Sequence, residues 1–216
     1  MPNWCNNNIE ITGPAKTINA LWTAATAEGV DEGGGLLNAM VPMPRELRET
    51  VKGSGDEKQT EKYDGFTNWY DWSVSRWGTK WDVDMEGIEY TDNEDGTATI
   101  SGYFDSAWAP PIEAYNTFLE QNEDCSLTAS YYEMGMDFAG LYDNGDDEYL
   151  ENLHDEFALP EDEQSDLYKR LDEEWGLSEQ FEEWITDENI DIDLDGGLSA
   201  IGEDGEDVIE AKGSYE

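Results

Sequence analysis

The order of the predicted elements constrains the fold of this chain more than any other feature of its sequence. Ile9 and Ile11 alternate with polar residues and predict a strand over residues 6–12, and Gly13 and Pro14 are typical of a turn that opens a helix. The apolar residues of that helix recur at helical spacing: Ile18, Leu21, Trp22 and Ala25. The chain therefore opens with a strand and an amphipathic helix.

A hairpin, two more helices and two more strands complete this order. The sequence predicts a helix over residues 68–78, a strand over 82–90, a turn over 93–96, a strand over 97–104, a helix from 110, and strands over 126–132 and 138–142. The order strand, helix, hairpin, helix, strand is the split pattern of a ferredoxin-like α+β sandwich with an antiparallel or mixed sheet. We expect that fold class.

Charge density divides the chain into two parts. The protein has 216 residues and a formal net charge of -42. Residues 1–150 carry 29 acidic and 8 basic side chains, and residues 151–216 carry 24 and 3, so each part has a net charge of -21. The shorter part holds its charge in less than half the length. We therefore expect a globular body that ends near Leu150, followed by an acidic and mainly helical appendage.

The composition indicates a folded protein without a membrane segment. Nine Trp, eleven Tyr and six Phe can supply a core, whereas chains that stay unfolded are poor in aromatic residues. No apolar run approaches the ~20 residues of a membrane span, and the first residues lack the features of a signal peptide. We expect a cytoplasmic location, with Cys5 and Cys125 as reduced thiols.

Four segments of the chain stand out as motifs: MPNWCNNNIEITGP at residues 1–14, WGTKWDVD at 77–84, FDSAWAPP at 104–111 and YYEMGMDFAGLYDNG at 131–145. Together and in this order, they resemble the YubB ferredoxin-like domain family of phage, plasmid and bacterial proteins. The resemblance implies a ferredoxin-like domain over residues 1–155 and leaves residues 156–216 as an acidic helical extension. It transfers no catalytic residue. "Ferredoxin-like" describes topology only, because two cysteines cannot supply the four thiolates of an iron–sulfur cluster, and no cofactor is expected.

Rows of carboxylates suggest a binding surface. No Lys or Arg occurs between Lys80 and Lys169, a run of 88 residues. In a strand, Asp82, Asp84 and Glu86 would project from one face about 6.6 Å apart, twice the rise per residue, and could imitate the phosphate spacing of DNA. Helices over 161–175 and 178–188 would extend this surface. An apolar seam of Leu167, Leu171 and Trp175 would leave these residues outward: Glu163, Asp166, Glu173 and Glu174.

Three other groups of residues have a functional and a structural interpretation. Trp77, Trp81 and Trp108 could form an aromatic binding pocket or pack a helix onto the sheet, and we favour packing. Asp191, Asp193 and Asp195 match the start of an EF-hand loop, but Gly202 stands where the bidentate Glu is required, so any calcium binding would be weak. His154 is the only histidine, and pairing with Cys5 or Cys125 would be required for nucleophilic catalysis.

These observations favour a binding protein over an enzyme. A polyanion repels nucleic acid and attracts basic protein surfaces, so we expect a non-enzymatic protein that binds a basic, DNA-binding host protein as a DNA mimic. The family resemblance implies that it is of phage or plasmid type. One alternative is an acidic accessory protein from a salt-adapted or marine virus or host, without an electrostatic target. Another is weak divalent-cation binding through residues 191–195.

Overall fold

The chain forms two compact units. The computed structural model describes residues 3–27, 34–52, 63–188, 190–192, 198–201 and 207–210, with side chains as far as residue 183. The first unit comprises residues 1–136 and 141–148, and the second comprises residues 137–140 and 149–216. None of the described helices combines the length and the apolar character that a membrane span needs.

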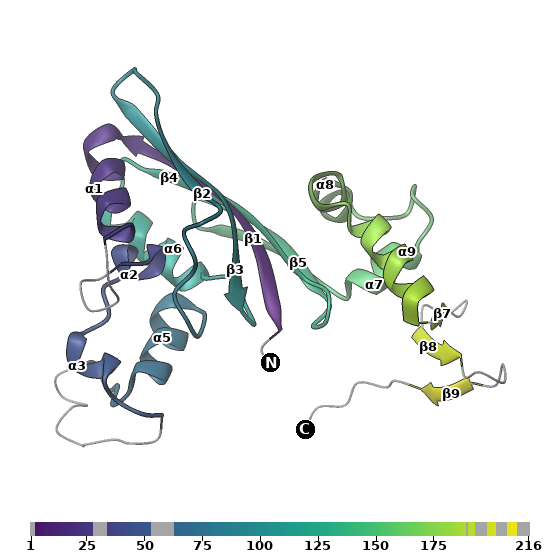
Figure 1. The fold of residues 1–216 in the computed structure, drawn as a ribbon. Helices are drawn as coiled ribbons and strands as arrows, with labels where there is room; N and C mark the ends of the chain where they lie inside the picture. Colours follow the sequence, from purple (N-terminus) through teal and green to yellow (C-terminus); the bar gives the residue numbers. More distant parts are fainter. Residues whose placement is uncertain are drawn as a thin grey trace. The chain divides into compact units, whose positions relative to one another are not determined.

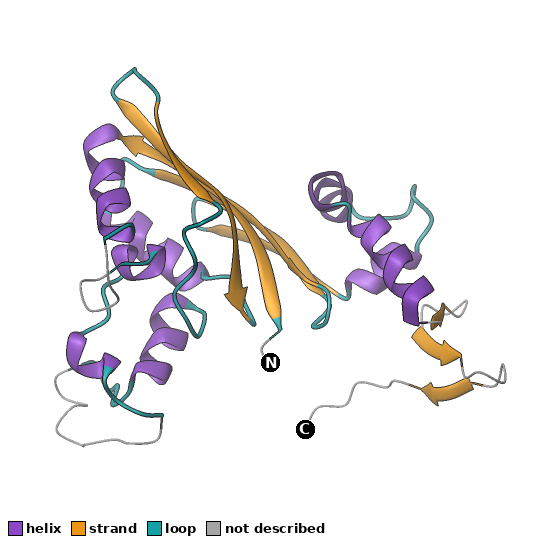
Figure 2. Cartoon of the chain, in the orientation of Figure 1, coloured by secondary structure: helices purple, strands orange, loops and turns teal. Residues whose placement is uncertain are grey.

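A six-stranded sheet organises the fold (Figures 1 and 2). Its strands are β1 (Trp4–Pro14), β2 (Ile88–Asp92), β3 (Thr97–Ala107), β4 (Ser126–Glu133), β5 (Phe138–Asp143) and β6 (Asp146–Glu151). Their order is β2-β3-β1-β4-β5-β6, and β1 pairs antiparallel with both β3 and β4. The predicted α+β class is confirmed, and the sheet is antiparallel.

The helices of the first unit lie on one side of this sheet (Figure 1). They are α1 (Ala15–Ala25), α2 (Leu36–Met40), α3 (Arg45–Arg48), α5 (Trp69–Trp77) and α6 (Ile112–Gln121). Ile9 and Ile11 of β1 are buried on the same strand face, as predicted, in one hydrophobic cluster with Ile18 and Leu21 of α1. Asn68 caps α5 by accepting a hydrogen bond from the Asp71 N–H, and Gly78 ends it at φ 85°.

The hairpin is confirmed, but its first strand begins later than predicted. Asp92 lies opposite Ala98 in the β2–β3 register, and the turn follows at residues 93–96. Residues 82–87 are irregular, so the predicted strand over 82–90 is wrong in its first part. The Asp82 side chain there accepts hydrogen bonds from backbone N–H groups of α2. β6 was not predicted, because DDEYLE has no clear apolar alternation.

The described residues of the second unit form three helices and a small sheet. The helices are α7 (Leu153–Ala158), α8 (Asp166–Trp175) and α9 (Leu177–Glu188), and the strands β7 (Ile190–Ile192), β8 (Leu198–Ile201) and β9 (Asp207–Glu210) pair in that order. Ser165 caps α8 and Gly176 ends it at φ 64°. Leu171 is buried as expected, but Tyr168 takes the central place in the seam, with Leu167 and Trp175 half-buried. The extension is thus helical in its first part, with strands after α9.

Candidate functional site

An acidic cavity of about 600 Å³ in the first unit gathers the predicted carboxylates of the hairpin region. Its lining residues are Trp4, Asp82, Asp84, Glu86, Gly87, Tyr103, Phe104 and Asp105. Asp82, Asp84 and Glu86 therefore share one cavity, although they do not form the row with strand spacing that the sequence suggested. The chain is irregular at these residues, so their side chains converge on a hollow.

Asp82, one of the residues that line this cavity, stabilises the fold. Its carboxylate accepts hydrogen bonds from the Leu37 N–H at 2.8 Å and the Asn38 N–H at 2.9 Å, the first turn of α2. Gly35 makes this approach possible, because a Cβ there would lie 2.2 Å from Asp82 Oδ2. Burial raises the pKa of the Asp82 carboxyl, an effect that the backbone N–H donors oppose. Asp82 is thus a helix cap.

The outer part of the acidic cavity combines exposed carboxylates with exposed rings. Asp84, Glu86 and Asp105 are exposed, as are Trp4 at 47% and Tyr103 at 56%. Carboxylates attract and hydrogen-bond ammonium or guanidinium groups, and aromatic faces attract the same cations. Sequence reasoning missed three of these residues: Trp4, Tyr103 and Asp105. The β1–β3 pairing could have identified these three residues, because it places them together on the strand face opposite the buried Ile9.

The three predicted tryptophans have two different roles. Trp77 is 5% exposed, and its Nε1–H donates to the Val41 carbonyl at 2.9 Å, so the packing interpretation holds for it. Trp81 and Trp108 instead hold a cation. The Lys80 Nζ lies 4.0 Å from the Trp81 ring centroid and 4.9 Å from the Trp108 ring centroid. We call Trp81 and Trp108 the indole clamp.

Two basic residues of the first unit line a second, larger hollow. This cavity of about 850 Å³ is lined by Arg48 and Lys80 together with Trp69, Trp77 and Trp81. Asp82 and Asp84 also line it, so these two carboxylates border both cavities. Opposite charges therefore share this region of the surface, within a unit whose overall charge is strongly negative.

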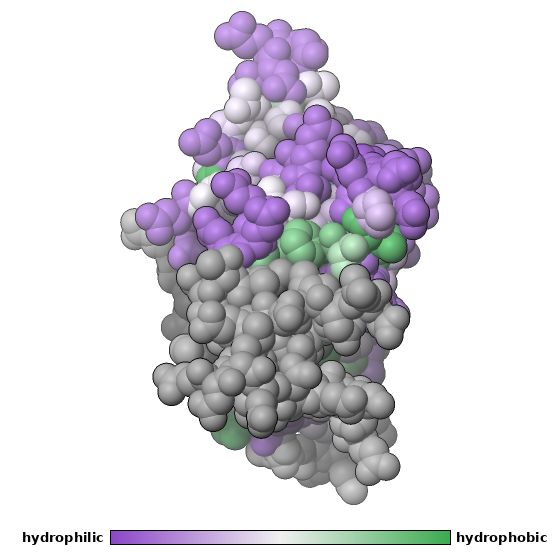
Figure 3. All heavy atoms as spheres, turned by 90° about the vertical axis from the view of Figure 1, so that its right-hand side faces the viewer, coloured by the Kyte–Doolittle hydropathy of each residue, from purple (hydrophilic) through white to green (hydrophobic). Residues whose placement is uncertain are grey.

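The predicted carboxylates of the second unit are exposed. Four carboxylates face solvent in and beside α8: Glu163, Asp166, Glu173 and Glu174. In the space-filling view, most of the described atoms that face the viewer belong to hydrophilic residues (Figure 3). Since residues 151–216 contain 24 carboxylates and three cationic side chains, their own cations cannot neutralise this charge. The surface presents a negative field to any partner.

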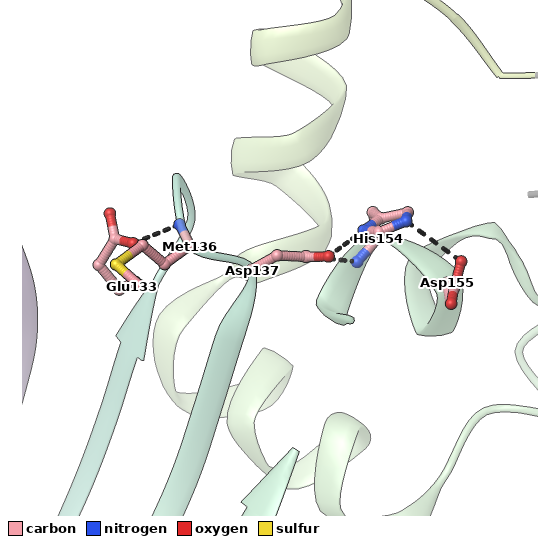
Figure 4. Close-up of polar contacts among 5 residues, drawn as sticks. All are labelled: Glu133, Met136, Asp137, His154 and Asp155. Atoms are coloured by element: carbon pink, nitrogen blue, oxygen red, sulfur yellow. Dashed lines mark hydrogen bonds and ion pairs between the residues drawn. The ribbon is translucent and has the colours of Figure 1, made fainter. Parts of the chain in front are cut away.

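His154 is fixed between two carboxylates (Figure 4). Its Nδ1 contacts Asp137, its Nε2 lies 3.2 Å from Asp155 Oδ1, and its backbone N–H donates to Asp137 Oδ1 at 3.0 Å. Burial raises the pKa of the Asp137 carboxyl, and its contacts with His154 oppose that rise. Nearby, Glu133 accepts the Met136 N–H and closes the preceding turn. These carboxylates cap turns and the start of α7.

The thiols and the predicted calcium ligands give no reactive centre within the described residues. Both cysteines are free; burial raises the pKa of the Cys5 thiol well above its ordinary value and that of Cys125 to about 11. Asp193 and Asp195 lie outside the described residues, as does the side chain of Asp191. Among the side chains that the structure describes, no group of three or more His, Cys, Asp or Glu residues could hold a metal ion.

Comparison with known proteins adds one distant structural similarity. No protein-family model and no curated protein matches the chain. A crystal structure of the protein api92 from Yersinia pseudotuberculosis, of family DUF1281, is similar over 70% of this chain and 98% of its own, with 13% identity and a TM-score of 0.39. At that level the similarity carries no argument about function.

Proposed function

We propose that this protein acts by binding a basic protein surface and imitates the charge of DNA toward that partner, without catalysing a reaction. The acidic cavity carries this proposal. Its exposed carboxylates Asp84, Glu86 and Asp105 stand beside the exposed rings of Trp4 and Tyr103, a combination suited to Lys and Arg side chains. The carboxylates around α8 would add long-range attraction that falls with salt.

The candidate catalytic groups support binding rather than chemistry. A thiol with a raised pKa supplies little thiolate at neutral pH, and burial raises the pKa of both cysteines. Both ring nitrogens of His154 contact carboxylates, which leaves neither of them oriented toward a nucleophile. The proposal therefore assigns no catalytic role to Cys5, Cys125 or His154.

We also propose that residues 1–155 form a YubB-type ferredoxin-like domain of phage or plasmid origin that acts in the cytoplasm. The strand order β2-β3-β1-β4 supports this assignment, with α1 after β1 and α6 after β3. Residues 156–216 would then be an addition to that domain, and its carboxylates would serve the same basic partner.

The test is capture of proteins from a host lysate at ~0.1 and ~1 M salt, which shortens the screening length about threefold. The first variant carries Asp84→Asn, Glu86→Gln and Asp105→Asn. The second carries Glu163→Gln, Asp166→Asn, Glu173→Gln and Glu174→Gln. A control with Glu89→Gln, Asp92→Asn and Glu94→Gln removes the same charge as the first variant from an exposed part of the hairpin.

We expect the wild type to capture a nucleic-acid-binding protein at low salt and to release it at high salt. The first variant should lose about tenfold or more in affinity, and the control should lose much less, because its residues lie outside the acidic cavity. Equal losses in variant and control would mean that only net charge matters. Capture of no basic protein would refute the proposal and favour acidity as an adaptation to salt.

A further inference from the structure

We propose that the indole clamp is a binding site for one arginine side chain of the basic partner, and that Lys80 occupies it in the free protein. This inference rests on the proposed function, because the arginine belongs to the partner. Two indole faces converge on the Lys80 ammonium at 4.0 and 4.9 Å, within the range at which a ring attracts a cation. The clamp is thus a cation-binding site that Lys80 of the same chain occupies.

The backbone at Trp108 is strained, which indicates that surrounding contacts hold the indole clamp in place. Trp108 has φ 73°, in a region that bulky residues rarely adopt. Its N–H donates to the Asn3 carbonyl at 3.0 Å, and Ser106 Oγ donates to the Ala109 carbonyl at 2.8 Å across the segment that contains Trp108. The Tyr70 ring meets the Trp108 ring edge to face. The indole orientation thus has several supports besides Lys80.

The segment that carries Trp81 is fixed independently as well. Thr79 Oγ1 donates to the Ala107 carbonyl at 2.8 Å, which ties this segment to the end of β3. Ser73 Oγ donates to the Lys80 carbonyl at 2.8 Å, and the Trp81 ring packs against Trp4 with centroids 6.0 Å apart. None of these contacts uses the Lys80 side chain. The clamp should therefore keep its shape when the flexible lysine side chain leaves.

Arginine fits the vacated clamp better than lysine. A guanidinium is planar and more weakly hydrated than an ammonium, so it stacks on ring faces at a smaller desolvation cost. Trp81 is 38% exposed, so a partner side chain can reach it, and the exposed Asp84 lines the same cavity as Trp81. An arginine would bring its charge to this carboxylate, and the displaced Lys80 would extend into solvent.

The direct test titrates the full ¹⁵N-labelled chain with Nα-acetyl-arginine methylamide and follows the indole N–H signals by NMR. Nα-acetyl-citrulline methylamide at matched ionic strength controls for shape without charge. The proteins are the wild type, Lys80→Ala, Lys80→Ala with Trp108→Gly, and Lys52→Ala. Lys52 is the matched control because its Nζ also stands over a ring, 3.7 Å from the Tyr70 centroid, and among the described residues it does not lie between two indoles. Trp108→Gly should fold, because glycine adopts positive φ without strain.

We expect Lys80→Ala to bind the arginine compound saturably and about tenfold more tightly than the wild type, and Trp108→Gly to abolish that gain. Trp81→Leu in the Lys80→Ala background should reduce the gain in affinity in the same way. This variant replaces Trp108→Gly in the test if Trp108→Gly does not fold. The proposal fails if Lys80→Ala binds no better than the wild type, if citrulline binds equally, or if Lys52→Ala gains as much.

The capture experiment separates this inference from the proposed function. If Trp108→Gly captures the basic partner as strongly as the wild type, the clamp is not the arginine site and the proposed function stands. If the wild type captures no basic protein, the proposed function fails, and the titration still decides whether the clamp binds arginine.

Discussion

The chain up to residue 150 and the chain beyond it carry the same net charge of -21 but accommodate it differently. The first unit has a large hydrophobic core and uses the partly buried carboxylates of Asp82 and Glu133 as caps. The second unit has a smaller described core, which includes Tyr168, Leu171 and Phe181, and exposes the carboxylates around α8. The second unit also uses carboxylates as backbone acceptors, at Asp137 and Asp172. The comparison therefore teaches that both units build carboxylates into their structure, and that they differ in the size of the core behind them.

The largest expected effect comes from truncating one core leucine in each unit. Leu127 and Leu171 are both 0% exposed, so replacing either by Ala should cost about 2–5 kcal/mol of the free energy of unfolding. Because the two belong to different units, each change should reduce hydrogen-exchange protection mainly in its own unit. Equal loss of protection in both units after Leu171→Ala would show that the units unfold together. The two units could then not be treated as separate in stability.

A smaller effect should separate the capping carboxylate from its exposed neighbour. Asp82→Ala leaves the Leu37 and Asn38 N–H groups without their acceptor and should cost about 1–2 kcal/mol in urea unfolding. Asp84→Ala, at an exposed side chain, should stay within about 0.5 kcal/mol. Asp82→Asn should recover part of the loss because the amide oxygen still accepts one bond. Similar costs for Asp82→Ala and Asp84→Ala would contradict the capping role.

The smallest effect concerns alkaline pH and compares one buried tyrosine from each unit, although the first unit buries others, among them Tyr115. Burial raises the pKa of Tyr142 and of Tyr168 from 10 to about 12. A raised pKa means that the stability which the neutral phenol contributes is complete below pH 10 and is lost as the pH rises to 12. We expect a loss of about 1 kcal/mol for each tyrosine after allowing for solvent screening.

Thermal unfolding between pH 9 and 12 would measure this loss, with Tyr142→Phe and Tyr168→Phe as matched variants. Each Phe variant should flatten the pH dependence in its own unit. A midpoint that stays constant up to pH 12 in the wild type would contradict the raised pKa values.

Local signals in the sequence predicted most elements of the first unit, and tertiary contacts decided the rest. Pro14 and Gly78 marked the ends of helices correctly because their effect on the backbone is local. The strand expected from Asp82 failed because alternation cannot reveal that a carboxylate caps a helix 45 residues earlier. No cavity was predicted: Asp82, Asp84 and Glu86 were expected as a row on a strand, whereas Trp4, Tyr103 and Asp105 join them through strand pairing.

The outer strand β6 has a consequence for the protein at high concentration. β6 stands last in the strand order of its sheet, and Asp146, Asp147 and Glu148 are exposed along it. An unpaired strand edge is a template for addition of another chain, but two copies that met along β6 would place like charges opposite one another. The same edge could still accept a strand that carries Lys or Arg. We therefore expect these carboxylates to disfavour pairing of β6 with the same strand of a second copy.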